Sequence, residues 1–183
     1  DQLPVLCRVI HTTADFSYKQ SLYFSPGVME AAAGAIESGV PIITDTTMAA
    51  SGINKRAASD HGIAVHCFIG DEDVKKRAET EKMTRSAVSV EKAARLYPDC
   101  IYAVGNAPTA LMRLYELIQE KKLCPRLIIG VPVGFVNVVE AKELILRAAV
   151  PCIVARGRKG GSNVAAAICN ALLYQTRKVE RRL

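Results

Sequence analysis

Aromatic residues are scarce in this sequence. The chain has 183 residues, of which 5% are aromatic, and it contains no tryptophan. Proteins that bind single-stranded nucleic acid stack the bases on aromatic side chains. The composition therefore argues against that class, although Lys and Arg outnumber Asp and Glu by 24 to 18. The basic residues also form no stripe along any one expected helix. We expect no nucleic-acid partner and interpret the positive charge as suited to an acidic small ligand.

Long apolar runs are absent as well. No run reaches the roughly 18 residues of a membrane-spanning helix, and the first residues lack the pattern of a secretory signal. The six cysteines form no C-x-x-C pair, and four of them lie in or beside apolar, strand-like runs. Disulfide and zinc frameworks need closer, paired spacings. We expect reduced thiols in the core, no membrane partner and a cytoplasmic location.

Familiar catalytic and metal motifs are missing too. His11, His61 and His66 have no metal-ligand spacing, and H-E-x-x-H does not occur. The G-x-S-x-G elbow of a serine hydrolase is also missing. The sequence therefore predicts no metal site and no Ser/His/Asp set.

Strands alternate with helices along the chain. Apolar runs predict strands at residues 5–10, 40–44, 63–69, 100–104, 126–130 and 152–155. The stretches between them favour helices at about residues 25–39, 48–59, 71–97 with a break near Thr84, 107–122, 139–149 and from 162 onward. The basic residues near the C-terminus (Arg177, Lys178, Arg181, Arg182) indicate a solvated helix end. We predict a single doubly wound α/β domain over residues 1–183, with a mainly parallel sheet of about five or six strands and helices on both faces.

Polar residues follow the ends of these strands. The exits carry His11, Thr12, Thr13, Asp15, Asp45, Thr46, Thr47, Asn106, Thr109, Phe135, Asn137, Arg156, Arg158 and Lys159. Ligands bind at the carboxyl ends of the strands in an open parallel sheet, so we expect the site there. An imidazole exchanges a proton near neutral pH, which makes His11 a catalytic candidate. The alternative is a hydrogen-bonded structural histidine.

Residues 156–162 form a glycine-rich, basic turn that opens a helix. Free N–H groups at a helix start favour an anion, and Arg156, Arg158 and Lys159 add charge. The spacing is neither a Walker loop nor G-x-G-x-x-G, so a basic loop with ordinary helix-start glycines remains the alternative. Residues 134–136 suggest a flat apolar contact, and residues 140–143 suggest a solvated helix face. These features together predict a large, partly apolar ligand with several carboxylates.

Four segments resemble the precorrin-8X methylmutase family. They are residues 8–16 (RVIHTTADF), 105–111 (GNAPTAL), 130–143 (GVPVGFVNVVEAKE) and 156–172 (RGRKGGSNVAAAICNAL). The resemblance implies an isomerase that moves a methyl group between neighbouring carbons of a tetrapyrrole (precorrin) macrocycle in cobalamin biosynthesis. It also implies an α/β homodimer with sites near the subunit interface, and no organic cofactor.

The resemblance also implies residue roles. The catalytic proton donor is His11. Residues expected to bind substrate are Arg8, Thr12, Thr13, Asn106, Thr109, Gly134, Phe135, Val136, Arg156, Arg158 and Lys159. Arg8 would hold a carboxylate, and residues 134–136 would lie against the ring.

Two points stay open at this stage. Family chains usually carry a further segment before RVIH, where this chain has only seven residues before Arg8, and precorrin-8X and cobalt-precorrin-8 versions look alike. A non-catalytic corrinoid carrier or sensor on the same scaffold is the competing function, and it would need the pocket but not His11.

Overall fold

The computed structural model describes residues 1–176, and its described part contains one six-stranded sheet. In spatial order the strands are Leu22–Phe24 (β1), Cys152–Ala155 (β6), Leu127–Gly130 (β5), Ile101–Val104 (β4), Ile42–Thr44 (β2) and Val65–His66 (β3). β1 pairs antiparallel with β6, and the other neighbours pair in parallel. The predicted α/β fold with a mainly parallel sheet is confirmed.

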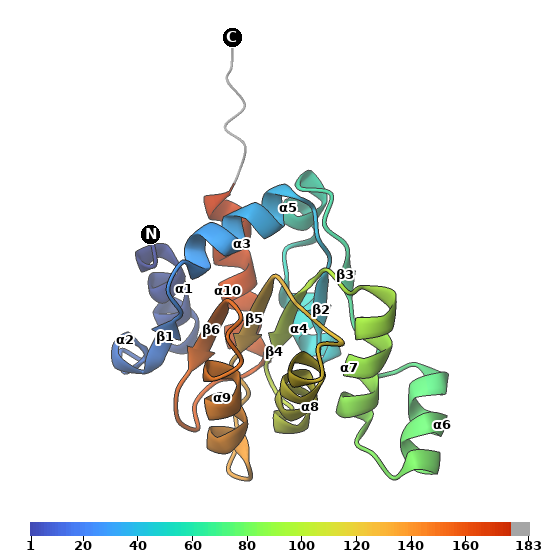
Figure 1. Cartoon of the computed structure of the whole chain (residues 1–183). Coiled ribbons are helices and arrows are strands. Elements are labelled where there is room, and N and C mark those ends of the chain that lie inside the picture. Colours follow the sequence, from blue (N-terminus) through green and yellow to red (C-terminus); the bar gives the residue numbers. More distant parts are fainter. Residues whose placement is uncertain (177–183) are drawn as a thin grey trace.

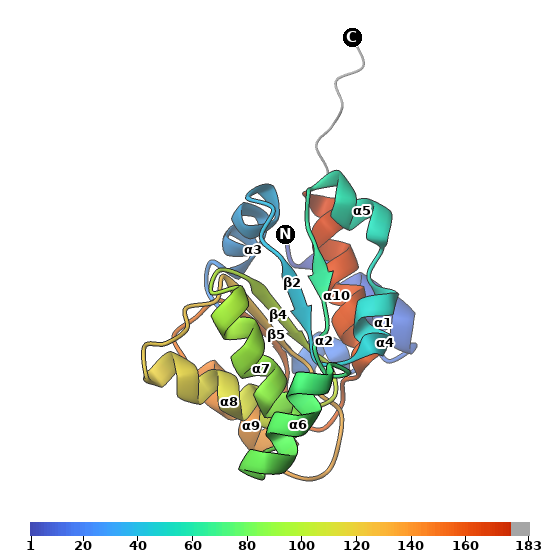
Figure 2. The ribbon, with the colours of Figure 1, turned by 90° about the vertical axis from the view of Figure 1, so that its right-hand side faces the viewer.

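Helices cover both faces of this sheet (Figures 1 and 2). One layer consists of α1 (Leu3–Thr13), α4 (Thr47–Gly52), α5 (Lys55–Asp60) and α10 (Ser162–Gln175), and α3 (Val28–Glu37) adds apolar residues to the same core. The other layer consists of α7 (Arg85–Leu96), α8 (Pro108–Gln119) and α9 (Val138–Leu146), with α6 (Glu72–Glu81) packed against α7. α2 (Tyr18–Ser21) is a single turn before β1. Of the helices that the structure describes, none combines the length and hydrophobicity needed to cross a membrane.

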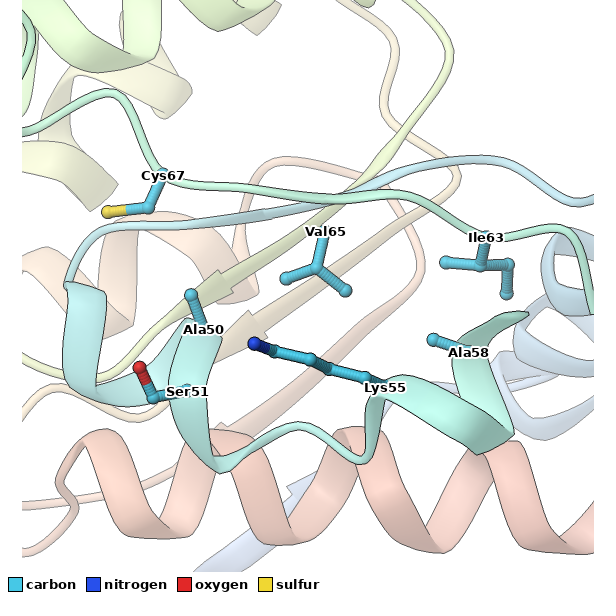
Figure 3. A pocket seen from close by; sticks show the side chains of 7 residues that line it. All are labelled: Ala50, Ser51, Lys55, Ala58, Ile63, Val65 and Cys67. Atoms are coloured by element: carbon cyan, nitrogen blue, oxygen red, sulfur yellow. The ribbon is translucent and has the colours of Figure 1, made fainter. Parts of the chain in front are cut away.

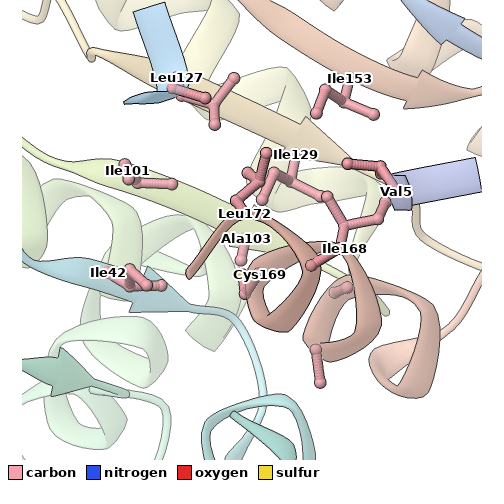
Figure 4. Packing of buried hydrophobic residues seen from close by; sticks show 14 of the residues in the cluster. Val5, Ile42, Ile101, Ala103, Leu127, Ile129, Ile153, Ile168, Cys169 and Leu172 are labelled. Carbon is pink, nitrogen blue, oxygen red and sulfur yellow. The ribbon is translucent and has the colours of Figure 1, made fainter. Parts of the chain in front are cut away.

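Alternate residues of the central strands point to opposite layers. Ile101 and Ile129 face α10 (Figure 4), whereas Tyr102 and Ile128 face the layer of α8 and α9. A parallel sheet buried on both faces requires this period of two. α10 packs along the middle of its layer. Because it follows β6 in the chain, its N-terminal end lies at the carboxyl edge of the sheet.

The first predicted strand is wrong, because residues 5–10 belong to α1. Val5 and Val9 are fully buried, and Leu6 and Ile10 are partly buried against the same core. This spacing of one and four residues is the apolar stripe of a helix, and Arg8 lies on its exposed side. The first strand is instead β1, whose three residues are too few to show a period.

Other boundaries shift for local reasons. Residues 48–59 form two helices, since the Asn54 side chain accepts a bond from the Ala57 N–H and starts α5 afresh. β3 has only two of the seven residues expected at 63–69. The break at Thr84 is confirmed, because its hydroxyl accepts from the Ala87 N–H and caps α7. The basic C-terminal residues 177–182 lie outside the described residues.

The strand order reverses between β2 and β4. β3 lies on one side of this pair, while β5 and β6 extend the sheet on the other. In open α/β sheets the crevice outside the carboxyl ends at such a switch point is the usual ligand site. The fold therefore directs attention to the segments that follow β2 and β4.

Candidate active site

Asp45 joins the two strand exits at the switch point. Its buried carboxylate accepts N–H bonds from Gly105 (2.8 Å), Asn106 (2.8 Å) and Ala107 (2.7 Å) just before α8. Burial raises the pKa of Asp45, and the three hydrogen bonds oppose that rise. The N–H groups that a ligand anion would otherwise meet here are thus occupied by the chain's own carboxylate.

The exits of β2, β4 and β5 pack against the start of α10. Thr46 Oγ1 lies 2.7 Å from Ser162 Oγ. A Cβ added to Gly105 would lie 2.6 Å from the Cα of Ser162, and one added to Gly160 would lie 2.0 Å from the Val131 carbonyl oxygen. Glycine is required at both positions because the backbones approach so closely. Residues 156–161, which we call the basic turn, are therefore fixed where these strand exits meet.

Two arginines of the basic turn lie over aromatic rings. The Arg156 guanidinium is 4.8 Å from the ring centroid of Tyr23, and that of Arg158 is 6.0 Å from the centroid of Phe135. Cation–π contacts at exposed sites are weak, so a carboxylate competes readily for either guanidinium. The structure thus brings together Arg158 and Phe135, as predicted from the strand exits.

Lys159 ties the segment after α1 to the basic turn. Its Nζ lies 2.6 Å from Asp15 Oδ2 and 2.9 Å from Ser17 Oγ. The hydrogen bond from Lys159 lowers the pKa of Asp15 to about 2, and bonds from Ser17 add to the effect. This ion pair also places the last turn of α1 beside the basic turn.

His11 occupies that last turn of α1. It is not at a strand end, as predicted, yet it reaches the carboxyl edge because α1 runs antiparallel to α10. Gln175, at the C-terminal end of α10, donates to the carbonyl of Asp1, just before α1, at 3.0 Å. Figure 1 shows the start of α1 and the end of α10 on the same side of the molecule. The exposed imidazole opens on a hollow of about 280 Å³. The lining residues are Pro4, Cys7, Arg8 and His11.

The polar neighbours of His11 have different surroundings. The Arg8 guanidinium lies 4.9 Å from the ring centroid of Tyr174, and the Thr13 hydroxyl donates to the Val9 carbonyl at 2.8 Å. Thr12 is exposed. Arg8 shares the hollow with His11, whereas the Thr13 hydroxyl is engaged within the helix.

Asn106 and Thr109 lie at the switch point, but their side chains differ in access. Asn106 is exposed, although its backbone N–H donates to the Asp45 carboxylate. The Thr109 hydroxyl accepts from the Thr84 hydroxyl at 3.0 Å and so links α8 to α7. Within residues 1–176 no hydrogen bond joins the Thr109 side chain to the basic turn.

Large apolar side chains flank the basic turn on both sides. Phe135 is 85% exposed and Val136 is 76% exposed after β5, while Phe16, between the Lys159 partners Asp15 and Ser17, is 79% exposed. Isolated exposed hydrophobic residues are common, but three around one turn form an apolar rim. Gly134 precedes Phe135 with a φ of +154°, a conformation that favours glycine.

The expectation of a solvated helix face at residues 140–143 is wrong for Lys142. Its side chain is 1% exposed, and its Nζ donates to the carbonyls of Gly157 (2.7 Å) and Lys159 (2.8 Å). Burial lowers the pKa of Lys142 to about 8. The signal was present in the sequence, because Val138, Ala141, Lys142 and Ile145 follow the spacing of a buried stripe.

The other histidines are engaged elsewhere in the fold. His61 Nε2 is 3.1 Å from the Leu173 carbonyl, and the His66 ring stacks on Tyr97 at 4.6 Å. Within residues 1–176 no group of three or more His, Cys, Asp or Glu side chains is arranged to hold a metal ion. The expectation of core thiols holds for Cys100, Cys152 and Cys169 but is wrong for Cys7 and Cys124, which are exposed.

A second hollow lies between β3 and the α4–α5 pair (Figure 3). It measures about 440 Å³ and is lined by Lys55, Ser51 and Cys67 together with the apolar side chains of Ala50, Ala58, Ile63 and Val65. It opens beside the edge strand of the sheet, and no residue predicted to bind substrate lines it. The residues predicted to bind substrate therefore lie outside this hollow.

The sheet and its switch point define a doubly wound α/β protein whose carboxyl edge carries the basic turn. A family model described as precorrin-8X methylmutase matches residues 1–175. The cobalt-precorrin-8 methylmutase of Salmonella typhimurium is 46% identical over 175 residues, which cover 95% of this chain and 81% of that protein. The precorrin-8X methylmutase of Pseudomonas aeruginosa is 38% identical over 167 residues, covering 90% and 80%.

A solved structure is similar over nearly the same length. It is the precorrin-8X methyl mutase of Thermus thermophilus, with a TM-score of 0.89, 40% identity, and coverage of 96% of this chain and 86% of that one. The chain therefore belongs to the precorrin-8X methylmutase family, and it is an isomerase of cobalamin biosynthesis.

Proposed function

We propose that this isomerase moves a methyl group between neighbouring carbons of precorrin-8X or cobalt-precorrin-8, giving hydrogenobyrinate or cobyrinate, with His11 as the proton donor. The observation that carries the proposal is the exposed imidazole of His11 in the last turn of α1, four residues before Asp15, whose carboxylate pairs with Lys159 of the basic turn. Both substrates are included because relatives of similar identity carry both names.

The imidazolium of His11 has a simple task in this reaction. A proton delivered to the conjugated macrocycle makes the ring electron-poor and so assists migration of the methyl group. Loss of a proton from the ring then gives the corrin chromophore, so that substrate and product are isomers. A positioned acid of this kind contributes about 10²–10⁴ to a rate.

The basic turn and Arg8 serve binding. The acetate and propionate groups of the macrocycle are matched by the cations Arg8, Arg156, Arg158 and Lys159, since charge-assisted hydrogen bonds are the stronger ones. When substrate binds, the Lys159 ammonium leaves the Asp15 carboxylate and pairs with a substrate carboxylate instead. Asn106, Thr109, Thr12 and Thr13 would supply further polar contacts, and residues 134–136 an apolar one against the ring.

We also propose that two copies of the chain complete the site. The hollow at His11, about 280 Å³, is smaller than the roughly 300–1,000 Å³ typical of pockets for drug-sized ligands, so one chain encloses only part of a macrocycle. A second copy would cover the apolar rim of Phe16, Phe135 and Val136. Sedimentation velocity should then give about twice the chain mass of 19.8 kDa, and Phe135→Glu should shift the protein to monomer. A cytoplasmic location fits the exposed thiols of Cys7 and Cys124, which stay reduced there.

The test of function is incubation of the protein with the tetrapyrrole precursor while the visible spectrum is recorded. Progressive conversion to a corrin spectrum at substoichiometric enzyme supports the proposal. An immediate, stoichiometric change without turnover would instead identify a carrier or sensor.

A further inference from the structure

Lys142 is a buried ammonium that the proposed mechanism does not use. It lies in the second turn of α9, between the buried residues Ala141 and Ile145, and is 1% exposed. Burying a cation is costly unless hydrogen bonds satisfy its donors. The buried ammonium of Lys142 is stabilised by the hydrogen bonds that it donates.

Both hydrogen bonds of the Lys142 ammonium go to the basic turn. Its Nζ donates to the Gly157 carbonyl at 2.7 Å and to the Lys159 carbonyl at 2.8 Å. The carbonyl between these two, that of Arg158, accepts from the Gly134 N–H at 3.2 Å. Three successive carbonyls of the turn are therefore held by α9 and the segment before it.

These contacts fix the direction of the turn's N–H groups. In a planar trans peptide the N–H points away from the preceding C=O, and the described chain has no cis peptide bond. The N–H groups of Arg158 and Gly160 therefore point away from Lys142. The N–H end of each of these peptide dipoles, which has partial positive charge, therefore faces away from Lys142.

The ends of the turn are held independently of Lys142. The Arg156 N–H donates to the Ser21 carbonyl at 2.8 Å, and the Gly161 N–H donates to the Val131 carbonyl at 2.8 Å. Loss of the lysine would thus loosen only the middle of the turn, which carries Arg158 and Lys159. A local effect of this kind can be separated from a loss of the fold.

We propose that Lys142 is a positioning residue, whose buried ammonium holds the basic turn so that its side chains and N–H groups meet the carboxylates of the ligand. The proposal rests on the proposed function, because it takes the ligand to be a polycarboxylate macrocycle. It predicts that Lys142 affects carboxylate recognition more than binding of the ring.

The test compares two probes on the same variants. Cobyrinic acid presents free carboxylates, and its fully methyl-esterified form presents the same ring without them. Lys142→Met should weaken binding of the acid about tenfold, the size of one lost charge-assisted hydrogen bond, and change binding of the ester less than twofold. In turnover the same variant should raise KM and leave kcat within about threefold.

Matched variants keep the result interpretable. Lys76→Met removes a lysine from the exposed side of α6 and should change neither affinity. Lys142→Gln keeps an N–H donor and serves if Lys142→Met does not fold, as judged by thermal unfolding; it should fall between Lys142→Met and the unchanged protein. Equal weakening of acid and ester, or no weakening of the acid, would overturn the proposal. Since binding needs no turnover, failure of the proposed reaction would leave this result readable.

Discussion

Removal of the Asp45 carboxylate should destabilise the protein strongly. Asp45 is the acceptor for three N–H groups at the switch point, two of which belong to the buried residues Gly105 and Ala107. A buried donor left without a partner costs about 1–3 kcal/mol, so the two together predict a loss of about 2–6 kcal/mol in Asp45→Ala. That is a large share of the roughly 5–15 kcal/mol that stabilises a typical protein.

Urea unfolding followed by far-ultraviolet circular dichroism measures this loss. Asp60→Ala, at the exposed end of α5, is the control and should stay within about 0.5 kcal/mol of the unchanged protein. Asp45→Asn keeps one acceptor oxygen and should lose less than Asp45→Ala. If Asp45→Ala unfolds at the same urea concentration as the control, the carboxylate does not hold the two strand exits together.

Two further predictions concern the basic turn. The pKa of Asp15 is about 2 in the folded protein against 3.8 ordinarily; the stability it contributes is therefore present above about pH 4 and lost as the pH falls toward 2. Acid titration of the urea midpoint should show a shallower decline in Asp15→Asn, and an identical decline would contradict the ion pair with Lys159. Arg158→Ala should raise KM about tenfold with kcat little changed, and the effect should shrink in high salt. Arg95→Ala, at an exposed position of α7, is its control, and a fall in kcat alone would refute a binding role.

The sequence predicted most of the layer architecture because its signals were long and local. β6 was placed at the residues it occupies, and the cap at Thr84 marked the break between α6 and α7. α1 was mistaken for a strand because its apolar residues form a short continuous run, and such a run does not distinguish the two. β3 was overestimated because tertiary pairing, not propensity, ends a strand at the sheet edge.

The position of some candidate residues could be predicted from the sequence, and that of others could not. His11 reaches the carboxyl edge even though its element was misassigned, because a helix antiparallel to α10 ends where a parallel strand would end. Lys142 was missed because charge was given more weight than its place in a buried stripe. Two sets of contacts could not be predicted, namely those of Asp45 with the start of α8 and that of Lys159 with Asp15. They join segments that are distant in the sequence, so no local pattern indicates them.

The most direct measurement of the central claim is the single-turnover rate of His11→Asn, together with its affinity for the corrin product. Asparagine keeps polarity in the exposed hollow but cannot deliver a proton. We expect the rate to fall by about 10²–10⁴ while product affinity stays near that of the unchanged protein, because the basic turn and the apolar rim remain. A rate near that of the unchanged protein in His11→Asn would contradict the assignment of His11 as the proton donor.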